Sequence, residues 1–424
     1  MRKPEMPHSP RPAKTKLPFV VPLLALGTFL MCTTEFMIAG LLEQMAHSFS
    51  VRPSQIGLLI TAFAFGMIVG APVMAVVTLR LPKRATLVLA LAIFAAGHVV
   101  AALSQSFDVL LGARVLTAVV TGAFWSVASV VATSAAGPQA SSRALGVMGS
   151  GVAMATVLGV PLGSLAGQHL GWRGTFWAVA AFAAVTAVIV GRFVPADGPA
   201  PVPSVRAEFR ALRDTRLWLV LGATVLVMGG CMGTFSFLSP LLTERTGVSL
   251  ALVPVVFVCF GVGSMIGTNV AGHLADRRPV GTFIAAAAAA AVVLALLIPL
   301  SANAATAVPL ITLLGAITMG IPPVATGLSV RLAASAPTLA VALTVSAFNG
   351  GIAIGSLVGG HTLNTSLGAT GPATVGVAMV VLGLIPLAVL AVMRTPSPAG
   401  RRAPRRKEAP MLRTQSPLRE TVAG

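Results

Sequence analysis

Long apolar stretches follow one another along almost the whole chain, and this pattern constrains the fold more than any other feature. A helix of about 20 residues crosses the roughly 30 Å hydrocarbon core of a bilayer. Backbone groups in lipid must be hydrogen-bonded within the protein, so each stretch predicts a transmembrane helix. The twelve stretches are 18–42, 56–79, 85–104, 109–132, 144–167, 174–194, 217–242, 250–272, 280–300, 305–330, 338–361 and 373–393.

The composition supports an all-α, multi-pass membrane protein, and we expect it in the inner (plasma) membrane. Only 9% of residues are charged, whereas a soluble domain carries about 25%. The first apolar span is too long for the core of a signal peptide and is followed by further spans, so we expect it to be retained as a helix.

The net charge of +18 reports topology rather than nucleic-acid binding. With the N-terminus in the cytoplasm, 25 of the 29 Lys and Arg residues fall on the cytoplasmic side, and three (Arg52, Arg173 and Arg245) fall outside. That orientation satisfies the positive-inside rule, and an even number of spans then places both termini in the cytoplasm.

Polar segments divide the chain into two halves of six helices. The segment 195–216 separates the halves. The two terminal segments are rich in Pro, Lys and Arg, which predicts disorder on the cytoplasmic side. The expected parts are a disordered N-terminus (1–16), a first half (17–194), a cytoplasmic linker (195–216), a second half (217–393) and a basic tail (394–424).

Glycine spacing indicates that the two halves are repeats. Gly66 and Gly70 in span 2 recur as Gly263 and Gly267 in span 8, at an offset of 197 residues. Glycines four residues apart lie on one helix face and let a neighbouring backbone approach closely. Span 5 and span 11 match in the same way, through Gly159, Gly163 and Gly167 and, 192 residues later, Gly351, Gly355 and Gly359. Two similar halves around a central site are a transporter architecture.

Glu35 is the one acid that we place well inside an apolar span. A carboxylate there costs about 2.5–3.5 kcal/mol even on lenient insertion scales, and such groups usually bind protons, ions or substrate. Burial favours the protonated form of a carboxyl group, as a proton-binding residue requires near neutral pH. We interpret Glu35 as that residue; a structural acid bonded to a neighbouring helix is the alternative.

Arg114 is the one basic side chain well inside a span. An unpaired charge in lipid is prohibitive, so its guanidinium must face a cavity or a partner. Glu35 is the embedded acid available to it, although sequence alone does not establish a contact. A structural role, in which Arg114 donates to backbone carbonyls, stays open.

Several motifs resemble those of the major facilitator superfamily, and within it the twelve-helix drug:proton antiporters. The run Gly159-Val160-Pro161-Leu162-Gly163 resembles the span-5 motif of the antiporters, and Arg114 matches the arginine of span 4. Thr33-Thr34-Glu35-Phe36-Met37 is similar to a branch that includes actinobacterial chloramphenicol exporters. The cytoplasmic loop motif is matched by Gly272, Asp276 and Arg277 in the second half and, in degenerate form, by Arg80, Lys83 and Arg84 in the first.

The resemblance implies roles for these residues. It places span 1 along a central cavity and gives Glu35 and Arg114 a part in proton coupling. It also implies that Gly159, Pro161, Gly163 and Gly167 form an antiporter motif, which we expect to pack between the halves. Candidate substrate-cavity residues, chosen as acidic or as soft apolar side chains, are Met31, Glu35, Phe124, Trp125, Met228, Met232 and Met319.

The resemblance, together with the embedded Glu35, therefore implies a proton-coupled exporter of a small, neutral organic compound, with an antibiotic such as chloramphenicol as the expected substrate. The alternatives are an exporter of a sugar, nucleoside or other metabolite, and a facilitator or importer. No zinc-protease motif or phosphate-binding loop occurs, so neither an enzyme nor an ATP-driven pump is expected. We expect no cofactor or metal, and a monomer whose partners are protons, substrate and membrane lipid.

Overall fold

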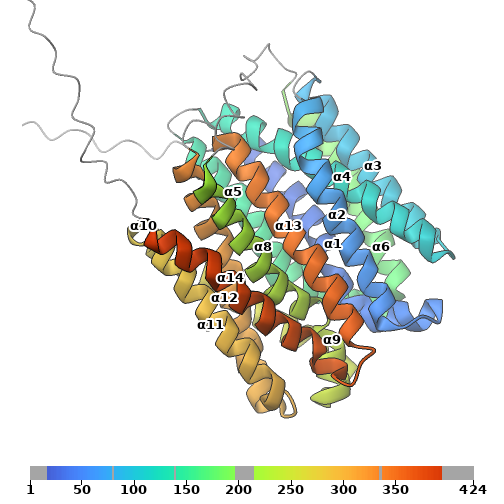
Figure 1. Cartoon of the computed structure of the whole chain (residues 1–424). Coiled ribbons are helices and arrows are strands. Elements are labelled where there is room, and N and C mark those ends of the chain that lie inside the picture. The colour runs from blue at the N-terminus through green and yellow to red at the C-terminus, as the bar shows by residue number, and fades with distance from the viewer. Residues whose placement is uncertain (1–16, 79–80, 138–139, 196–213, 334–336, 394–424) are drawn as a thin grey trace, which may run out of the picture. The chain divides into compact units, whose positions relative to one another are not determined.

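The computed structural model describes residues 17–78, 81–137, 140–195, 214–333 and 337–393, and in these it is helical (Figure 1). The long helices of the first half are α1 (Val20–Phe49), α2 (Pro53–Val77), α3 (Lys83–Leu103), α4 (Phe107–Ala136), α5 (Ser141–Met154) and α6 (Val160–Phe193). A π-helical turn, η2 (Ala155–Gly159), joins α5 to α6. Those of the second half are α8 (Thr215–Ser236), α10 (Val253–Arg277), α11 (Pro279–Leu300), α12 (Ala304–Leu332), α13 (Pro337–Thr362) and α14 (Gly371–Val392).

Eleven helical stretches among the described residues are long and apolar enough to cross a membrane. One of them, 144–193, has 50 residues. A continuous helix of that length would span about 75 Å, far more than one crossing requires. Gly171 interrupts it with a non-helical φ of 70°. The count of twelve spans and the cytoplasmic termini stay predictions.

Helix ends differ from the apolar stretches in a consistent way. The first apolar stretch ends at residue 42, but α1 continues to Phe49 and is followed by Ser50, a C-cap residue whose φ is 53°. Similarly, α10 continues to Arg277, beyond the apolar stretch that ends at residue 272. Hydrophobicity reports where lipid begins, whereas backbone hydrogen bonding carries a helix past that point through polar residues.

The glycine repeat corresponds to a repeat in packing. A Cβ atom on Gly66 would meet Ala118 of α4, and one on Gly70 would meet Val119. In the second half, a Cβ atom on Gly263 would meet Thr312 of α12, and one on Gly267 would meet Ala316. Spans 2 and 8 therefore use the same glycine pair to approach equivalent neighbours, as the offset of 197 residues predicts.

The glycines of the antiporter motif pack within the first half, so the expectation that they lie between the halves is wrong. Gly159, Gly163 and Gly167 each face α1, at Thr33, Met37 and Leu41 respectively. Their counterparts in α13 face α8 in the same manner, since Gly351 and Gly355 meet the backbone around Gly229. Glycine spacing predicted the tight face but not the helix that fills it.

Two of the contacts between the halves, among the described residues, involve corresponding helices. In the first, α2 lies beside α13 (Figure 1), and the Thr61 and Ser356 hydroxyls are hydrogen-bonded at 2.7 Å. In the second, α10 crosses η2, where a Cβ atom on Gly261 would meet the backbone of Val157 at 2.5 Å. Span 2 of the first half thus contacts span 11 of the second, and span 8 of the second half contacts span 5 of the first. Because spans 2 and 8 correspond to each other, as do spans 5 and 11, these two contacts are equivalent, as expected for two related halves.

Some expectations lie outside the described residues. These are the disordered N-terminus, nearly all of the linker, the basic tail, Arg80 and the side chain of Asp276.

Candidate central transport site

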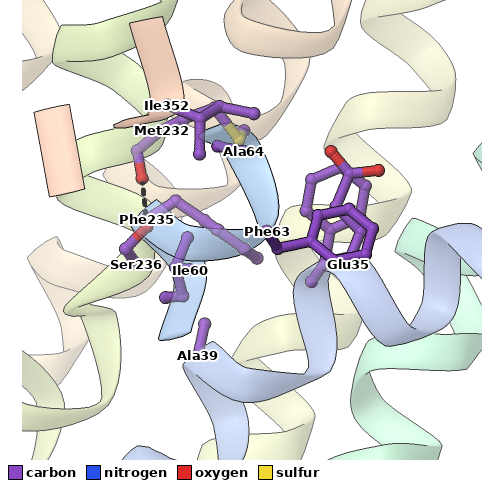
Figure 2. Close-up of a pocket in the computed structure, with 10 residues that line it drawn as sticks. Glu35, Ala39, Ile60, Phe63, Ala64, Met232, Phe235, Ser236 and Ile352 are labelled. Carbon is purple, nitrogen blue, oxygen red and sulfur yellow. Dashed lines mark hydrogen bonds between the residues drawn. The ribbon is translucent and has the colours of Figure 1, made fainter. Parts of the chain in front are cut away.

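A hollow lies where helices of both halves converge (Figure 2). Its lining residues come from α1, α2, α8 and α13: Glu35, Phe36, Ala39, Ile60, Phe63, Ala64, Met232, Phe235, Ser236 and Ile352. The hollow is narrow, because its volume of about 10 Å³ is roughly what a single water molecule needs. A drug-sized ligand therefore requires the lining to move apart.

Glu35 brings a carboxylate to this mostly apolar hollow, in the middle of α1. Figure 2 draws it beside Phe63, at one side of the pocket, with the α8 side chains at the other. Among the described residues, no ion pair or hydrogen bond engages its side chain. Glu35 is also half-buried rather than sealed. A proton can therefore bind or leave without breaking a bond to a neighbouring side chain.

Arg114 is fully buried in α4 and is anchored to two helices of its own half. Its Nη1 donates to the carbonyl of Thr34 at 3.2 Å, and its Nε donates to the carbonyl of Leu59 at 3.4 Å. The guanidinium lies 4.4 Å from the ring centroid of Phe63, a residue that lines the hollow. Nη2 has no partner in the described structure.

Glu35 and Arg114 are neighbours that interact through space without an ion pair. Arg114 bonds the carbonyl of Thr34, the residue that precedes Glu35, so its charge is fixed close to the carboxylate. Sequence alone did not establish whether Glu35 and Arg114 are in contact. In the described residues, Arg114 makes hydrogen bonds to backbone carbonyls and a ring contact with Phe63, and it forms no ion pair with Glu35.

A second carboxylate, Glu43, links the halves at the end of the bundle that carries the α1–α2 connection. Its Oε1 accepts hydrogen bonds from Thr243 at 2.6 Å and from Ser239 at 3.2 Å. These hydroxyls belong to α9 (Leu238–Pro240) and η4 (Leu241–Arg245). At the same end, Gln168 donates to the Leu250 carbonyl at 2.6 Å. We call this region the α1–α2 end.

Comparison with known families decides the class of protein, because residues 24–338 match the Major Facilitator Superfamily. The chain belongs to the major facilitator superfamily. It is 36% identical to a chloramphenicol resistance protein of Streptomyces lividans over 390 residues, which cover 90% of this chain and 99% of that protein. It is 32% identical to the inner membrane transport protein YdhP of Escherichia coli K12, over 83% of this chain and 91% of that protein.

Solved structures agree on the fold. A bacterial homologue of the human lysosomal transporter Spinster, crystallised in an inward-facing and unoccupied conformation, has a TM-score of 0.69 at 18% identity, covering 88% of this chain and 95% of that one. Its occupied counterpart has a TM-score of 0.70 at the same identity and coverage. The chain is accordingly a multi-pass membrane transporter of this superfamily rather than an enzyme.

Of the seven residues expected in the cavity, Glu35 and Met232 line the hollow. Phe124 instead packs against Gly27 of α1, and Met228 packs against Gly351 of α13. Met31 is buried inside the first half, while Trp125 and Met319 are half-buried, and none of these three lines the hollow.

Sequence reasoning missed most of the lining because it is ordinary in composition. Phe63, Phe235 and Ile352 resemble any core residue, and nothing in their spacing marks a cavity. Ser236 is a partial exception, since a hydroxyl in an apolar span is a weak signal, but its hydroxyl donates to the Met232 carbonyl of its own helix at 2.8 Å. Figure 2 shows this bond at the wall of the hollow.

The residues of the loop motif lie at helix ends. Lys83 begins α3, and Arg84 follows it, exposed beside a surface groove between α3 and α6. Gly272 and Arg277 belong to the last turns of α10. None of these four residues lines the central hollow.

Proposed function

We propose that this protein exports a small, neutral organic compound in exchange for protons, and that chloramphenicol is its substrate. It acts as a twelve-span protein of the inner (plasma) membrane, with both termini in the cytoplasm. The α1–α2 end then faces outward. Transport proceeds by alternating access, in which the halves open the central hollow to one side of the membrane at a time.

One observation carries the proposal: Glu35 places an unpaired carboxyl group on the central hollow, inside a membrane span. A carboxyl group held in an ion pair would stay charged, whereas one without a partner responds to the proton concentration and to its surroundings. Once the lining has moved apart, substrate entering the hollow would displace solvent around Glu35. The same residue is thereby able to sense both proton and substrate.

The lining supports a neutral substrate with an aromatic part. Phe36, Phe63 and Phe235 supply ring faces, and Met232 supplies a polarizable side chain that adapts to different shapes. The Arg114 guanidinium is buried over the Phe63 ring and held by backbone carbonyls, so it does not present a free cation for an organic anion. The chloramphenicol resistance relative supports the choice of drug.

The proton gradient supplies enough energy for useful export. One charge moving through about 100 mV releases about 2.3 kcal/mol. At about 1.4 kcal/mol per factor of ten, this sustains roughly a 40-fold drug gradient. With a neutral drug and one proton, the pH difference adds to this term.

The test uses everted membrane vesicles with an acidic lumen and a pH-sensitive dye in the medium. Adding chloramphenicol to vesicles with the wild-type protein should cause proton release from the lumen together with drug accumulation. A panel of sugars and nucleosides, added separately, distinguishes metabolite export. Uptake of any compound without proton movement would indicate a facilitator and would contradict proton exchange.

The matched variants are Glu35→Gln and Asp108→Asn. Asp108 is an exposed carboxyl group in the first turn of α4, so Asp108→Asn controls for loss of a negative charge. We expect Glu35→Gln to abolish chloramphenicol-driven proton release at normal membrane levels, and Asp108→Asn to retain it. Release by wild-type vesicles with a sugar or nucleoside alone would contradict the proposed drug.

A further inference from the structure

Asn349 of α13 is a buried side chain with an unused hydrogen-bond acceptor. It is 4% exposed. Its Nδ2 donates to the carbonyl of Val345 at 3.0 Å, which fixes the orientation of the carboxamide, and its Oδ1 has no partner in the described structure. Buried polar atoms are nearly always hydrogen-bonded, so an orphaned acceptor requires an explanation.

The position of Asn349 on its helix directs it toward the centre of the protein. Residues spaced three or four apart share one face of a helix, and Ile352 and Ser356 lie on the same face as Asn349. Ile352 lines the central hollow, and Ser356 bonds Thr61 of α2. The opposite face of α13 carries the exposed side chains of Ile354, Leu357 and Val358.

The neighbour of Asn349 along this face locates it further. Val345, one turn before Asn349, packs against the cluster of Phe63, Met67 and Ala118. Phe63 also lines the hollow and lies under the Arg114 guanidinium, whose Nη2 is a second orphaned group. Along α13, Asn349 therefore lies between Ile352, which lines the hollow, and Val345, which packs against the Phe63 cluster. Asn349 itself is not among the residues that line the hollow in this conformation.

We propose that Asn349 determines substrate specificity by accepting a hydrogen bond from a hydroxyl or amide N–H group of the transported compound. The inference rests on the proposed function and narrows the substrate class to neutral aromatic compounds that carry such a donor. An apolar hollow rejects few compounds by itself, whereas an acceptor left unpaired without the right donor discriminates strongly.

The test is a binding cycle on the full-length protein purified in detergent. Chloramphenicol is a neutral nitroaromatic with two hydroxyl groups and one amide N–H. Three derivatives are used, and in each of them the hydrogen of one of these three donors is replaced by a methyl group. We expect Asn349→Leu to bind chloramphenicol about tenfold more weakly than wild type. The wild type should bind one of these methyl derivatives about tenfold more weakly than chloramphenicol itself. Asn349→Leu should show no such loss of affinity for that derivative beyond the steric effect of the methyl group.

Thermal unfolding without ligand separates this role from a structural one. Because Asn349→Leu removes an unsatisfied buried acceptor, the variant should unfold at the same or a higher temperature than wild type. Asn349→Ala serves as a second variant in case leucine does not fit. Ser329→Ala is the control, since it removes a buried hydroxyl without a hydrogen-bond partner in the last turn of α12. This variant should leave affinity unchanged.

Each outcome decides between the proposals. Equal losses for every derivative in wild type and Asn349→Leu, or unchanged affinity in both Asn349 variants, would overturn the role of Asn349 while leaving chloramphenicol as substrate. A lower unfolding temperature with unchanged affinity would show a structural residue. No binding of chloramphenicol by the wild type would overturn the proposed substrate and the role of Asn349 with it.

Discussion

Arg114 illustrates, at the scale of a single residue, how a buried charge is held without an acid. Its guanidinium uses two nitrogens on two carbonyls from different helices, at Thr34 and Leu59. A lysine has one ammonium group on a flexible stem and cannot reach both carbonyls in this geometry. The alternative left open by the sequence, a backbone-bonding role, therefore holds for the described contacts and coexists with the charge near Glu35.

We expect Arg114→Lys to destabilise the protein by about 2–3 kcal/mol, because a charged buried hydrogen bond is lost. Thermal unfolding in detergent measures this effect. Chloramphenicol-driven proton release should fall as well, since the charge near Glu35 is no longer fixed. Unchanged unfolding and unchanged proton release in Arg114→Lys would show that the two carbonyl bonds contribute nothing.

Glu244, outside the membrane spans, predicts a pH dependence at the α1–α2 end. Partial burial, and then the nearby Glu43 carboxylate, raise the pKa of Glu244 above the ordinary value of 4.5. A carboxyl group with a raised pKa binds its proton more tightly in the folded protein than in the unfolded chain. Its contribution to stability is therefore largest at low pH and is lost as pH rises through the folded pKa.

The unfolding temperature of wild type should thus fall from about pH 5 to neutral pH relative to that of Glu244→Gln. Glu43→Gln should give an intermediate slope, because it removes the second of the two causes. Parallel pH profiles for wild type and Glu244→Gln would argue against the raised pKa.

At the same scale, the sequence identified the charged members of the site and little else. Glu35 and Arg114 stood out because charge is rare in an apolar span, and Met232 was found among several methionines. Asn349 and Ser236 went unnoticed, since a single amide or hydroxyl in a span is common. Phe63 carries no local signal at all, because its place under Arg114 depends on how α2 meets α4.

At the scale of the helix, glycine positions decide how closely neighbours approach. Gly267 of α10 lies against the carbonyl of Ala316 in α12, whereas Gly272, one turn later, has open space where a Cβ atom would go. The two positions form a matched pair in one helix. They separate the packing requirement from the general cost of glycine in a helix.

Gly267→Ala should lower stability by about 1–3 kcal/mol through overpacking. Gly272→Ala should be neutral or stabilising by up to about 1 kcal/mol, because alanine favours the helix. Unfolding temperatures of the two variants make the comparison. Equal effects at both sites would contradict the close approach of α10 and α12.

Helices were more predictable than their partners. The apolar stretches located the long helices of the part of the chain that the structure describes, but polar ends such as Glu43–Phe49 of α1 extend beyond what hydropathy marks. Repeated glycines predicted tight faces correctly. They did not reveal that Gly159 faces α1 of its own half, because spacing on one helix holds no information about which neighbour occupies the face.

At the scale of the whole molecule, transport by alternating access requires the halves to move at the α2–α13 contact. Thr61 and Ser356 are bonded there at 2.7 Å, toward the α1–α2 end. A disulfide between Thr61→Cys and Ser356→Cys, in a background with Cys32, Cys231 and Cys259 replaced, should block transport until a reductant is added. The single-cysteine variants are the controls. Full transport by the oxidised pair would contradict movement at this contact.

The sequence similarity of the two halves predicted how helices pack within each half, but it did not predict the residues that line the central hollow. Matching offsets in spans 2 and 8, and in spans 5 and 11, predicted equivalent packing in both halves, and the structure shows it. The hollow is different, because it forms only when four helices from both halves come together. No segment of the sequence contains it.

The central claim is that Glu35 carries the proton exchanged for substrate. The most direct measurement is proton release from purified protein in a weakly buffered solution, followed with a pH dye as chloramphenicol is added, alongside drug binding. We predict about one proton released per drug bound by wild type and by Asp108→Asn, and none by Glu35→Gln, which still binds the drug. Undiminished release by Glu35→Gln would contradict the account.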